Sequence, residues 1–239
     1  MKAAIVTGGS KGLGRALALG LADEGWSLVL DARDATGLEE AAREIRSRRA
    51  SGASVKAISG DVTSDLHRQS LIDAASELGA LDLIVNNASE LGPSPLPELA
   101  DYPLESLRRV LEVDVVAPLA VLQQAVRLLE QSENPRVLNI TSDASVEHYE
   151  RWGGYGLAKA ALDHLSATFA AENPHVRTWA VDPGDLRTDM HQRAYPGEDI
   201  SDRPLPESVV ARLLSLINSD LTSGRYKASE IPVTEEVGT

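Results

Sequence analysis

The chain has 239 residues, of which 43% are hydrophobic, and it carries a formal net charge of −13 and no cysteine. This length suffices for one domain with a sizeable core, and the acidic balance argues against nucleic acid as a partner. Without thiols there are no disulfides, cysteine nucleophiles or cysteine-bound metals, and the five histidines are too scattered to predict a metal site.

The sequence also argues against a membrane partner, because no apolar run approaches the ~20 residues that a membrane span needs. The N-terminal stretch "AAIVT" (3–7) is too short for the core of a signal peptide and runs into a glycine-rich turn. We therefore expect a cytoplasmic protein in which this stretch is the first strand.

Short apolar, β-branched runs alternate along the chain with longer helical patterns. We predict strands at 3–7, 27–32, 54–59, 81–87, 136–142, 176–182 and 224–229. We predict helices at about 12–25, 36–50, 64–79, 103–131, 153–172 and 205–219. Apolar strands between helices are typical of a parallel sheet buried on both faces. The sequence therefore predicts an α/β protein in which residues 1–239 form a single domain, with a doubly wound sheet of about seven strands flanked by helices.

The segment "TGGSKGLG" (7–14) joins the first predicted strand to the first predicted helix. A helix start presents unpaired N–H groups and the positive end of the helix dipole, which suit a pyrophosphate. Its glycines, spaced Gly8-x3-Gly12-x-Gly14, let the backbone turn sharply and let a ligand approach closely. This position in a βαβ unit favours a dinucleotide-binding turn over a plain turn.

The segment "YGLAK" places Tyr155 and Lys159 one turn apart on one face of a predicted helix. A tyrosine has a pKa of ~10, which is too high for a base at neutral pH. A nearby cation lowers that pKa by roughly 1–3, so we expect Lys159 to make Tyr155 a usable acid–base group.

With "NNAS" (86–89), Ser142 and "DPGDLRT" (182–188), these motifs resemble the short-chain dehydrogenase/reductase family over essentially the whole chain, in the family's order and spacing. The resemblance implies a Rossmann fold that binds NAD or NADP at the carboxyl ends of the strands. It implies that Ser142 orients the substrate oxygen, Tyr155 transfers the proton, and Lys159 tunes Tyr155 and holds the nicotinamide ribose. The cofactor contacts that it implies are Gly8, Ser10, Lys11, Gly12, Leu13, Gly14, Arg33, Asp61, Val62, Asn87, Ala88, Tyr155, Lys159, Pro183, Gly184, Leu186 and Thr188.

The resemblance favours NADP(H) over NAD(H) as cofactor. Lys11 and Arg33 match basic positions of members that prefer NADP. The acid of NAD-binding members would fall at Ala32, although Asp31 lies one residue away. NAD(H) therefore stays open, and Lys11 as a solvated charge and Asp61 as an acid at a helix start are the simpler alternatives.

Two positions depart from the family pattern. Asp114 stands where the family has an asparagine that holds a water in a proton relay, and Ser89 replaces the final glycine of NNAG. Pro118 cannot donate to the Asp114 carbonyl, which could still hold that water. Asp114 could instead pair with Lys159 and weaken its effect on Tyr155. If residue 89 needs positive φ, Ser89 carries a modest strain.

We predict an NADP(H)-dependent oxidoreductase acting on a small carbonyl or alcohol. The alternative is a non-catalytic, dinucleotide-binding regulator or scaffold, for which the two departures are the only support. The resemblance also implies a homodimer or homotetramer paired through the helices at 103–131 and 155–172. Candidates for the substrate pocket, each equally able to be an ordinary loop residue, are Leu91, Glu147, His148, Tyr149, Trp152, Tyr195 and the loop 187–206.

Overall fold

The computed structural model describes residues 1–49 and 52–233, and its centre is one parallel sheet. The strands are β1 (Ala3–Val6), β2 (Ser27–Ala32), β3 (Val55–Ser59), β4 (Leu83–Asn86), β5 (Arg136–Ile140), β6 (Arg177–Asp182) and β7 (Gly224–Lys227). They lie in the order β3-β2-β1-β4-β5-β6-β7, and every neighbouring pair is parallel. The predicted doubly wound sheet of about seven strands is confirmed.

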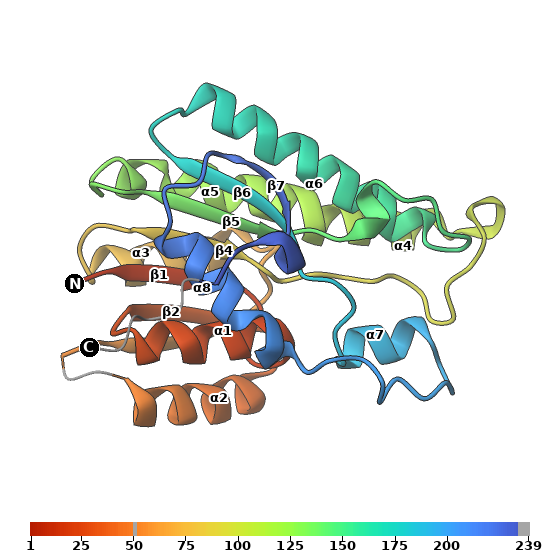
Figure 1. The fold of residues 1–239 in the computed structure, drawn as a ribbon, viewed down its shortest axis with the longest axis horizontal. Helices are drawn as coiled ribbons and strands as arrows, with labels where there is room; N and C mark the ends of the chain where they lie inside the picture. Colours follow the sequence, from red (N-terminus) through yellow and green to blue (C-terminus); the bar gives the residue numbers. More distant parts are fainter. Residues whose placement is uncertain (50–51, 234–239) are drawn as a thin grey trace.

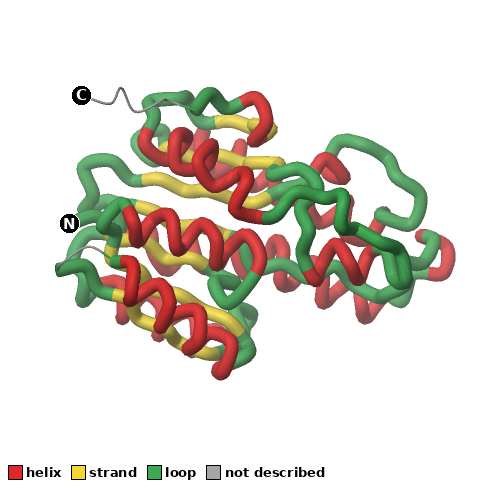
Figure 2. The backbone as a smooth tube through the Cα atoms, turned by 60° about the horizontal axis from the view of Figure 1, so that its bottom comes forward, coloured by secondary structure: helices red, strands yellow, loops and turns green. Residues whose placement is uncertain are grey.

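Helices cover both faces of this sheet. They are α1 (Gly12–Asp23), α2 (Ala35–Arg48), α3 (Asp65–Ser76), α4 (Leu104–Leu111), α5 (Ala117–Leu129), α6 (Gly153–Glu172), α7 (Asp189–Ala194) and α8 (Val210–Asn218). Figures 1 and 2 show α1, α2 and α8 side by side over one face, with α3, α5 and α6 behind the other. In Figure 1, α7 lies beyond the carboxyl ends of the strands, where open α/β sheets bind ligands.

Alternation along the strands divides the core into two layers. Val6 and Leu30 pack with the helices of one face, whereas Ile5 and Val29 pack with those of the other. All four are fully buried. Because the sheet is buried on both faces, its strands show continuous apolar sequence rather than strict alternation with polar residues.

The helix that the sequence predicts at 103–131 is interrupted in the structure. A π-helical turn over Glu112–Val116 separates α4 from α5, and the Ala117 N–H donates to the Glu112 carbonyl five residues back. Pro118, one residue later, has no N–H to continue the regular pattern. Turns of this kind are frequent at functional sites, and this one carries Asp114.

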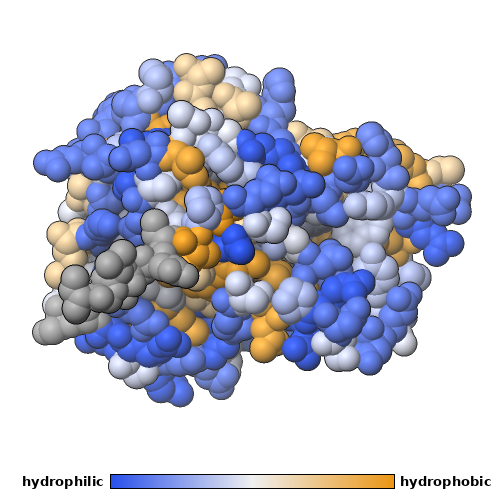
Figure 3. Space-filling model, viewed as in Figure 1, coloured by the Kyte–Doolittle hydropathy of each residue, from blue (hydrophilic) through white to orange (hydrophobic). Residues whose placement is uncertain are grey.

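Hydrophilic residues make up most of the surface in Figure 3, and hydrophobic ones gather in smaller patches. Exposed apolar side chains also lie at Leu104, Leu119 and Leu157, on the helices through which the resemblance predicts pairing. That pairing stays a prediction. Of the helices in 1–49 and 52–233, none has the length and apolar character to cross a bilayer.

Candidate active site

The turn between β1 and α1 has the backbone geometry that phosphate binding needs. Gly8 and Gly12 have φ angles of 68° and 56°, a region that L side chains rarely adopt. Lys11 is the N-cap of α1, and its side chain makes no capping hydrogen bond. The first N–H groups of α1 therefore have no side-chain acceptor and are oriented to receive an anion.

Close packing beneath the turn depends on Gly14. A Cβ added there would lie 2.4 Å from the Gly8 carbonyl oxygen and 2.4 Å from Asn87 Nδ2. The Asn87 amide donates to the carbonyls of Thr7 (2.9 Å) and Gly8 (3.2 Å), which ties the end of β4 to the turn. The turn thus fits a dinucleotide pyrophosphate, because its glycines leave room for the ligand and the first N–H groups of α1 can donate to it.

A cavity of about 740 Å³ opens above the carboxyl ends of the strands. Every candidate cofactor and catalytic residue lines it except Gly14, which lies under the turn, and Asp114, which lies behind the wall. Of the pocket candidates, Leu91, Tyr149, Trp152 and Tyr195 line the cavity, and Glu147 and His148 do not. Further lining residues that the sequence did not single out include Arg15, Arg109, Val113, Ile140 and Asp143, and His191 lines the cavity from the predicted loop 187–206.

The carboxylate of Asp31, at the end of β2, has partners within the protein. Asp31 is buried, where its Oδ1 accepts the Gly8 N–H (2.7 Å) and its Oδ2 contacts His67 Nε2 (3.1 Å). Its carboxylate therefore holds the phosphate turn from inside. Ala32 and the exposed Arg33, the next two residues, also line the cavity.

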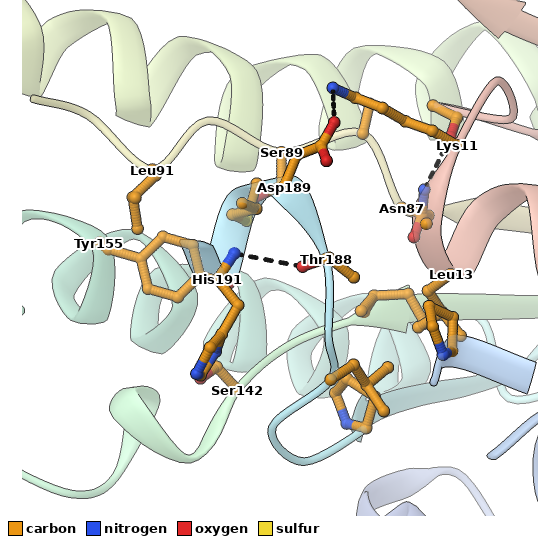
Figure 4. Close-up of a pocket in the computed structure, with 18 of the residues that line it drawn as sticks. Lys11, Leu13, Asn87, Ser89, Leu91, Ser142, Tyr155, Thr188, Asp189 and His191 are labelled. Carbon is orange, nitrogen blue, oxygen red and sulfur yellow. Dashed lines mark hydrogen bonds and ion pairs between the residues drawn. The ribbon is translucent and has the colours of Figure 1, made fainter. Parts of the chain in front are cut away.

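Carboxylates reach the two basic candidates from across the cavity. Lys11 Nζ lies 2.7 Å from an oxygen of Asp189 on α7 (Figure 4), and Arg33 lies 3.6 Å from Glu90. The Lys11 pair is exposed, so water screens it, and it contributes little to stability. Both cations are thus available to exchange a carboxylate for a phosphate.

Asp61, a candidate adenine contact, is held by α4. Arg109 donates to its Oδ2 (2.7 Å) and to the Thr63 hydroxyl (3.0 Å). Partial burial raises the pKa of Asp61, but hydrogen bonds from Thr63 and Arg109 outweigh it and lower that pKa to about 2. The "GDVTSD" segment alone could not predict that Arg109, on a distant helix, would contact Asp61.

Tyr155 and Lys159 lie together in α6, as their spacing predicts. Lys159 Nζ is 5.3 Å from the centroid of the Tyr155 ring, and it donates to the Ile140 carbonyl at the end of β5 (3.0 Å). It also lies 2.9 Å from Asp114 Oδ1, with both side chains almost fully buried. Burial lowers the pKa of Lys159, but Asp114 and Tyr155 outweigh burial, so the pKa is raised and the ammonium persists.

The two departures from the family pattern contact each other. The Ser89 hydroxyl donates to Asp114 Oδ1, and the Glu90 N–H donates to Oδ2 (2.8 Å). Of the described non-glycine residues, Arg151 alone has a positive φ, so the strain considered for Ser89 is absent. Asp114 is thus fully satisfied by Ser89, Glu90 and Lys159, as a buried carboxylate must be.

These contacts change the expected electrostatics of Tyr155. Burial raises the pKa of its phenol, Lys159 opposes that effect, and the Asp114 carboxylate adds to it. Asp182 raises the pKa further. Among the protein's own groups the result is a raised pKa, so the expected net lowering is wrong. Lys159 has the predicted sign, but Asp114 neutralises much of its charge.

Ser142 lies just beyond β5, where its hydroxyl donates to Asp143 Oδ1 (3.0 Å) and accepts the Ala144 N–H (3.2 Å). The Tyr149 hydroxyl donates to the other oxygen of Asp143 (2.8 Å), which raises the pKa of Tyr149 to about 12. Asp143 therefore holds Ser142 at the cavity. In the sequence, the only signal for this role of Asp143 is that it directly follows Ser142.

The segment after β6 forms the remaining wall. Gly184 has a φ of 75° and turns the chain beside Pro183, and Leu186 is buried against α1. The Thr188 hydroxyl accepts the His191 N–H (3.2 Å, Figure 4) and so caps α7. This helix lies within the predicted loop 187–206. Because the Thr188 hydroxyl is the acceptor in this bond, it can still donate its proton to another partner.

The pattern of the short chain dehydrogenase family matches residues 2–199, so the chain belongs to this family of oxidoreductases. It is 36% identical over 246 residues to the rhamnolipids biosynthesis 3-oxoacyl-(acyl-carrier-protein) reductase of Pseudomonas aeruginosa, covering 95% of this chain and 92% of that protein. The predicted family and enzyme class are confirmed.

Solved structures show the same fold. A short chain dehydrogenase from Pseudomonas syringae superposes with a TM-score of 0.88 at 29% identity, covering 95% of this chain and 94% of the other. An alcohol dehydrogenase from the archaeon Thermococcus sibiricus, solved with 5-hydroxy-NADP, superposes with a TM-score of 0.83 at 28% identity, covering 95% of each chain.

Replacing Gly14 with alanine should destabilise the fold by about 1–3 kcal/mol, because the new methyl group meets a backbone oxygen that cannot move freely. Dinucleotide binding should weaken in parallel. Denaturant unfolding and calorimetric titration with NADPH measure the two effects. Gly224→Ala, whose Cβ would meet only an ordinary contact at 3.7 Å, is the control. Equal behaviour of the two variants would contradict the packing argument.

Replacing Asp114 with asparagine should lower the pKa of Tyr155, because a carboxylate that raises it is removed and Lys159 loses its counter-charge. NMR titration of isotope-labelled tyrosine rings measures this, with the Tyr155 resonance assigned by Tyr155→Phe. Glu112→Gln, on the same π-helical turn, is the control. Turnover should stay similar or rise. An unchanged or higher pKa, or a large loss of turnover, would show that Asp114 has another role.

Proposed function

We propose that the protein is an NADP(H)-dependent oxidoreductase that interconverts a carbonyl compound and its alcohol. The observation that carries the proposal is the meeting, in one cavity, of Tyr155 beside Lys159 with a phosphate turn built at the start of α1. Neither feature alone defines this chemistry. Together they support a dinucleotide whose pyrophosphate lies on the turn and whose nicotinamide end lies near Tyr155 in the same cavity.

A bound nicotinamide dinucleotide supplies or accepts the hydride. In reduction, the Tyr155 hydroxyl gives its proton to the carbonyl oxygen as negative charge develops there. Ser142 donates a hydrogen bond to the same oxygen, for which its hydroxyl rotates away from Asp143. The reverse sequence, with Tyr155 accepting the proton, oxidises the alcohol.

Lys159 supports this step from a fixed position. An ammonium has three N–H donors, and Asp114 and Ile140 take two of them. The third is free for the cavity, where a ribose hydroxyl or the tyrosinate can accept it. The positive charge thus remains beside Tyr155 in both proton states, although Asp114 reduces its effect.

The raised pKa of Tyr155 suits its phenol to the role of proton donor near neutral pH. A group with a raised pKa stays protonated, and a protonated phenol is the donor that carbonyl reduction requires. Oxidation requires the tyrosinate, whose population grows only as pH rises. The name of the 36% identical relative, a 3-oxoacyl reductase, supports a ketone as the substrate.

Support for NADP(H) comes from charge. Lys11 and Arg33 lie at the cavity beside the end of β2, and both oxygens of Asp31 are already engaged, by the Gly8 N–H and by His67. A free acid at this edge would favour the 2′-hydroxyl of NAD, whereas a cation suits the 2′-phosphate of NADP. The NADP analogue bound to the archaeal relative agrees with this choice.

Tyr155→Phe should lower NADPH-dependent ketone reduction on the order of 10²–10⁴-fold, because the ring stays but the proton donor is lost. Initial rates over a panel of aldehydes and ketones, each with its KM, measure the effect. Tyr226→Phe, whose hydroxyl bonds the Thr222 carbonyl away from the cavity, is the matched control. Equal activity of the parent and Tyr155→Phe would contradict the role of Tyr155. If both bound NADPH but reduced nothing over a broad panel, the non-catalytic regulator would be the better account.

Arg33→Ala should raise the Kd for NADPH roughly tenfold or more, as expected for one lost charge-assisted hydrogen bond, and leave the Kd for NADH nearly unchanged. Calorimetry or cofactor fluorescence gives both constants. Arg43→Ala, exposed on α2, controls for a general change in charge. Equal losses for the two cofactors would contradict the assignment of NADP(H).

A further inference from the structure

The part of the cavity in front of Tyr155 has a wall of its own, separate from the two layers of the main core. It is an apolar cluster formed by the segment after β4, the start of α6 and the helix α7. Its members are Leu91, Leu96, Ala144 and Tyr155, with Trp152, Met190 and Ala194 packed against them. A substrate held here would contact hydrocarbon over most of its surface.

Four rings form a continuous row along this wall. Tyr155 and Trp152 meet edge to face with centroids 5.8 Å apart, Trp152 lies 6.0 Å from Tyr195, and Tyr195 lies 5.0 Å from His191. Such distances are typical of favourable aromatic pairs. The row brings α7 over the proposed proton donor, with the imidazole of His191 at its far end.

His191 is the polar member of the row, and one of its nitrogens is unsatisfied. The residue is 8% exposed, and Nε2 has no hydrogen-bond partner among the residues that the structure describes. Its other nitrogen, Nδ1, is 3.9 Å from Asp185, beyond hydrogen-bond distance. The ring lines the cavity with Tyr155 and Ser142, and in the view of Figure 4 it points toward Ser142.

A buried polar atom without a partner calls for an explanation, because burial removes its hydrogen bond to water. A ligand oxygen that enters the cavity would supply the missing bond. A neutral imidazole donates from one nitrogen and accepts at the other, so Nε2 can meet either a carbonyl or a hydroxyl oxygen. Ser142 and Tyr155 are assigned to the reacting oxygen, which leaves His191 for a different one.

We propose that His191 recognises a second oxygen of the substrate. The substrate class is then an apolar ketone, aryl or alkyl, that carries another carbonyl or hydroxyl oxygen within a carbon or two of the reacting carbonyl. This inference rests on the proposed function and adds specificity to it. Such selectivity is physically reasonable, since a ketone without the second oxygen would leave the His191 nitrogen buried and unpaired.

Two matched pairs of ketones test the assignment. Benzil and deoxybenzoin share a skeleton, but only benzil has the second carbonyl. Ethyl benzoylacetate and hexanophenone share the reacting aryl ketone, but only the first has an ester oxygen two carbons away. For each pair, the ratio of kcat/KM values with NADPH is compared between the parent, His191→Phe, which keeps a ring against Tyr195, and His191→Gln, which keeps a side-chain donor and acceptor.

His191→Phe should lower this ratio roughly threefold to tenfold in at least one pair, through the oxygenated ketone alone, and His191→Gln should restore much of it. His175→Phe, exposed in the loop after α6, is the matched control and should change nothing. Unchanged ratios in both pairs, or an equal loss for all four ketones, would overturn the proposal.

Calorimetric binding of the same ketones to the protein with NADP⁺ separates this inference from the proposed function. If the parent reduces ketones but His191→Phe binds benzil and ethyl benzoylacetate as tightly as the parent does, the role of His191 is wrong and the oxidoreductase assignment stands. If no ketone is reduced, the proposed function fails, and a selective loss of oxygenated ketones from His191→Phe would still show that His191 contacts them. Equal binding there would overturn both.

Discussion

A buried ion pair joins the parts of the structure on which the site depends. Lys159 extends from α6 to Asp114 on the π-helical turn and to the carbonyl that ends β5. Asp114 in turn accepts hydrogen bonds from Ser89 and Glu90, in the segment that follows β4. One ammonium and one carboxylate thus connect two helices and two strand ends. Removing either would leave a charge buried without its partner, which is far more costly than losing a surface pair.

This arrangement also explains how the chain accommodates two unusual residues. Ser89 and Asp114 are 25 positions apart in the sequence, and each looks like an isolated departure from the family pattern. In the structure they are hydrogen-bond partners: the Ser89 hydroxyl is the donor and the buried Asp114 carboxylate is the acceptor. The pairing also affects the pKa of Tyr155. Lys159 lowers that pKa, and the Asp114 carboxylate, bound to Lys159, opposes this effect. The pKa of Tyr155 therefore depends on burial first and then on the opposing charges of Lys159 and Asp114.

The sequence predicted most of the framework, because the framework depends on local patterns. Apolar runs placed the strands well, and the range 27–32 agrees with β2 at both ends. The glycine spacing and the i, i+4 pair located the phosphate turn and the proton donor. What failed were properties that arise between distant segments. The pairing of Asp114 with Lys159 was one of two possibilities, and the hydrogen bond between Gly8 and Asp31 was not foreseen. The short helix α7, capped by Thr188, lies in a segment that was predicted as a loop.

The π-helical turn has a consequence for how the helices on either side of it are oriented. A regular α-helix advances about 100° per residue, so one extra residue in a turn rotates everything beyond it by that angle. α4 holds Asp61 through Arg109 on one side of this turn, and α5 packs into the sheet on the other. Because the π-helical turn takes up one more residue than an α-helical turn does, it keeps these two surfaces in phase, whereas the same residues wound as a regular helix would rotate one surface away from the other. The surface that holds Asp61 and the surface that packs on the sheet are therefore aligned by a single irregularity in helix pitch.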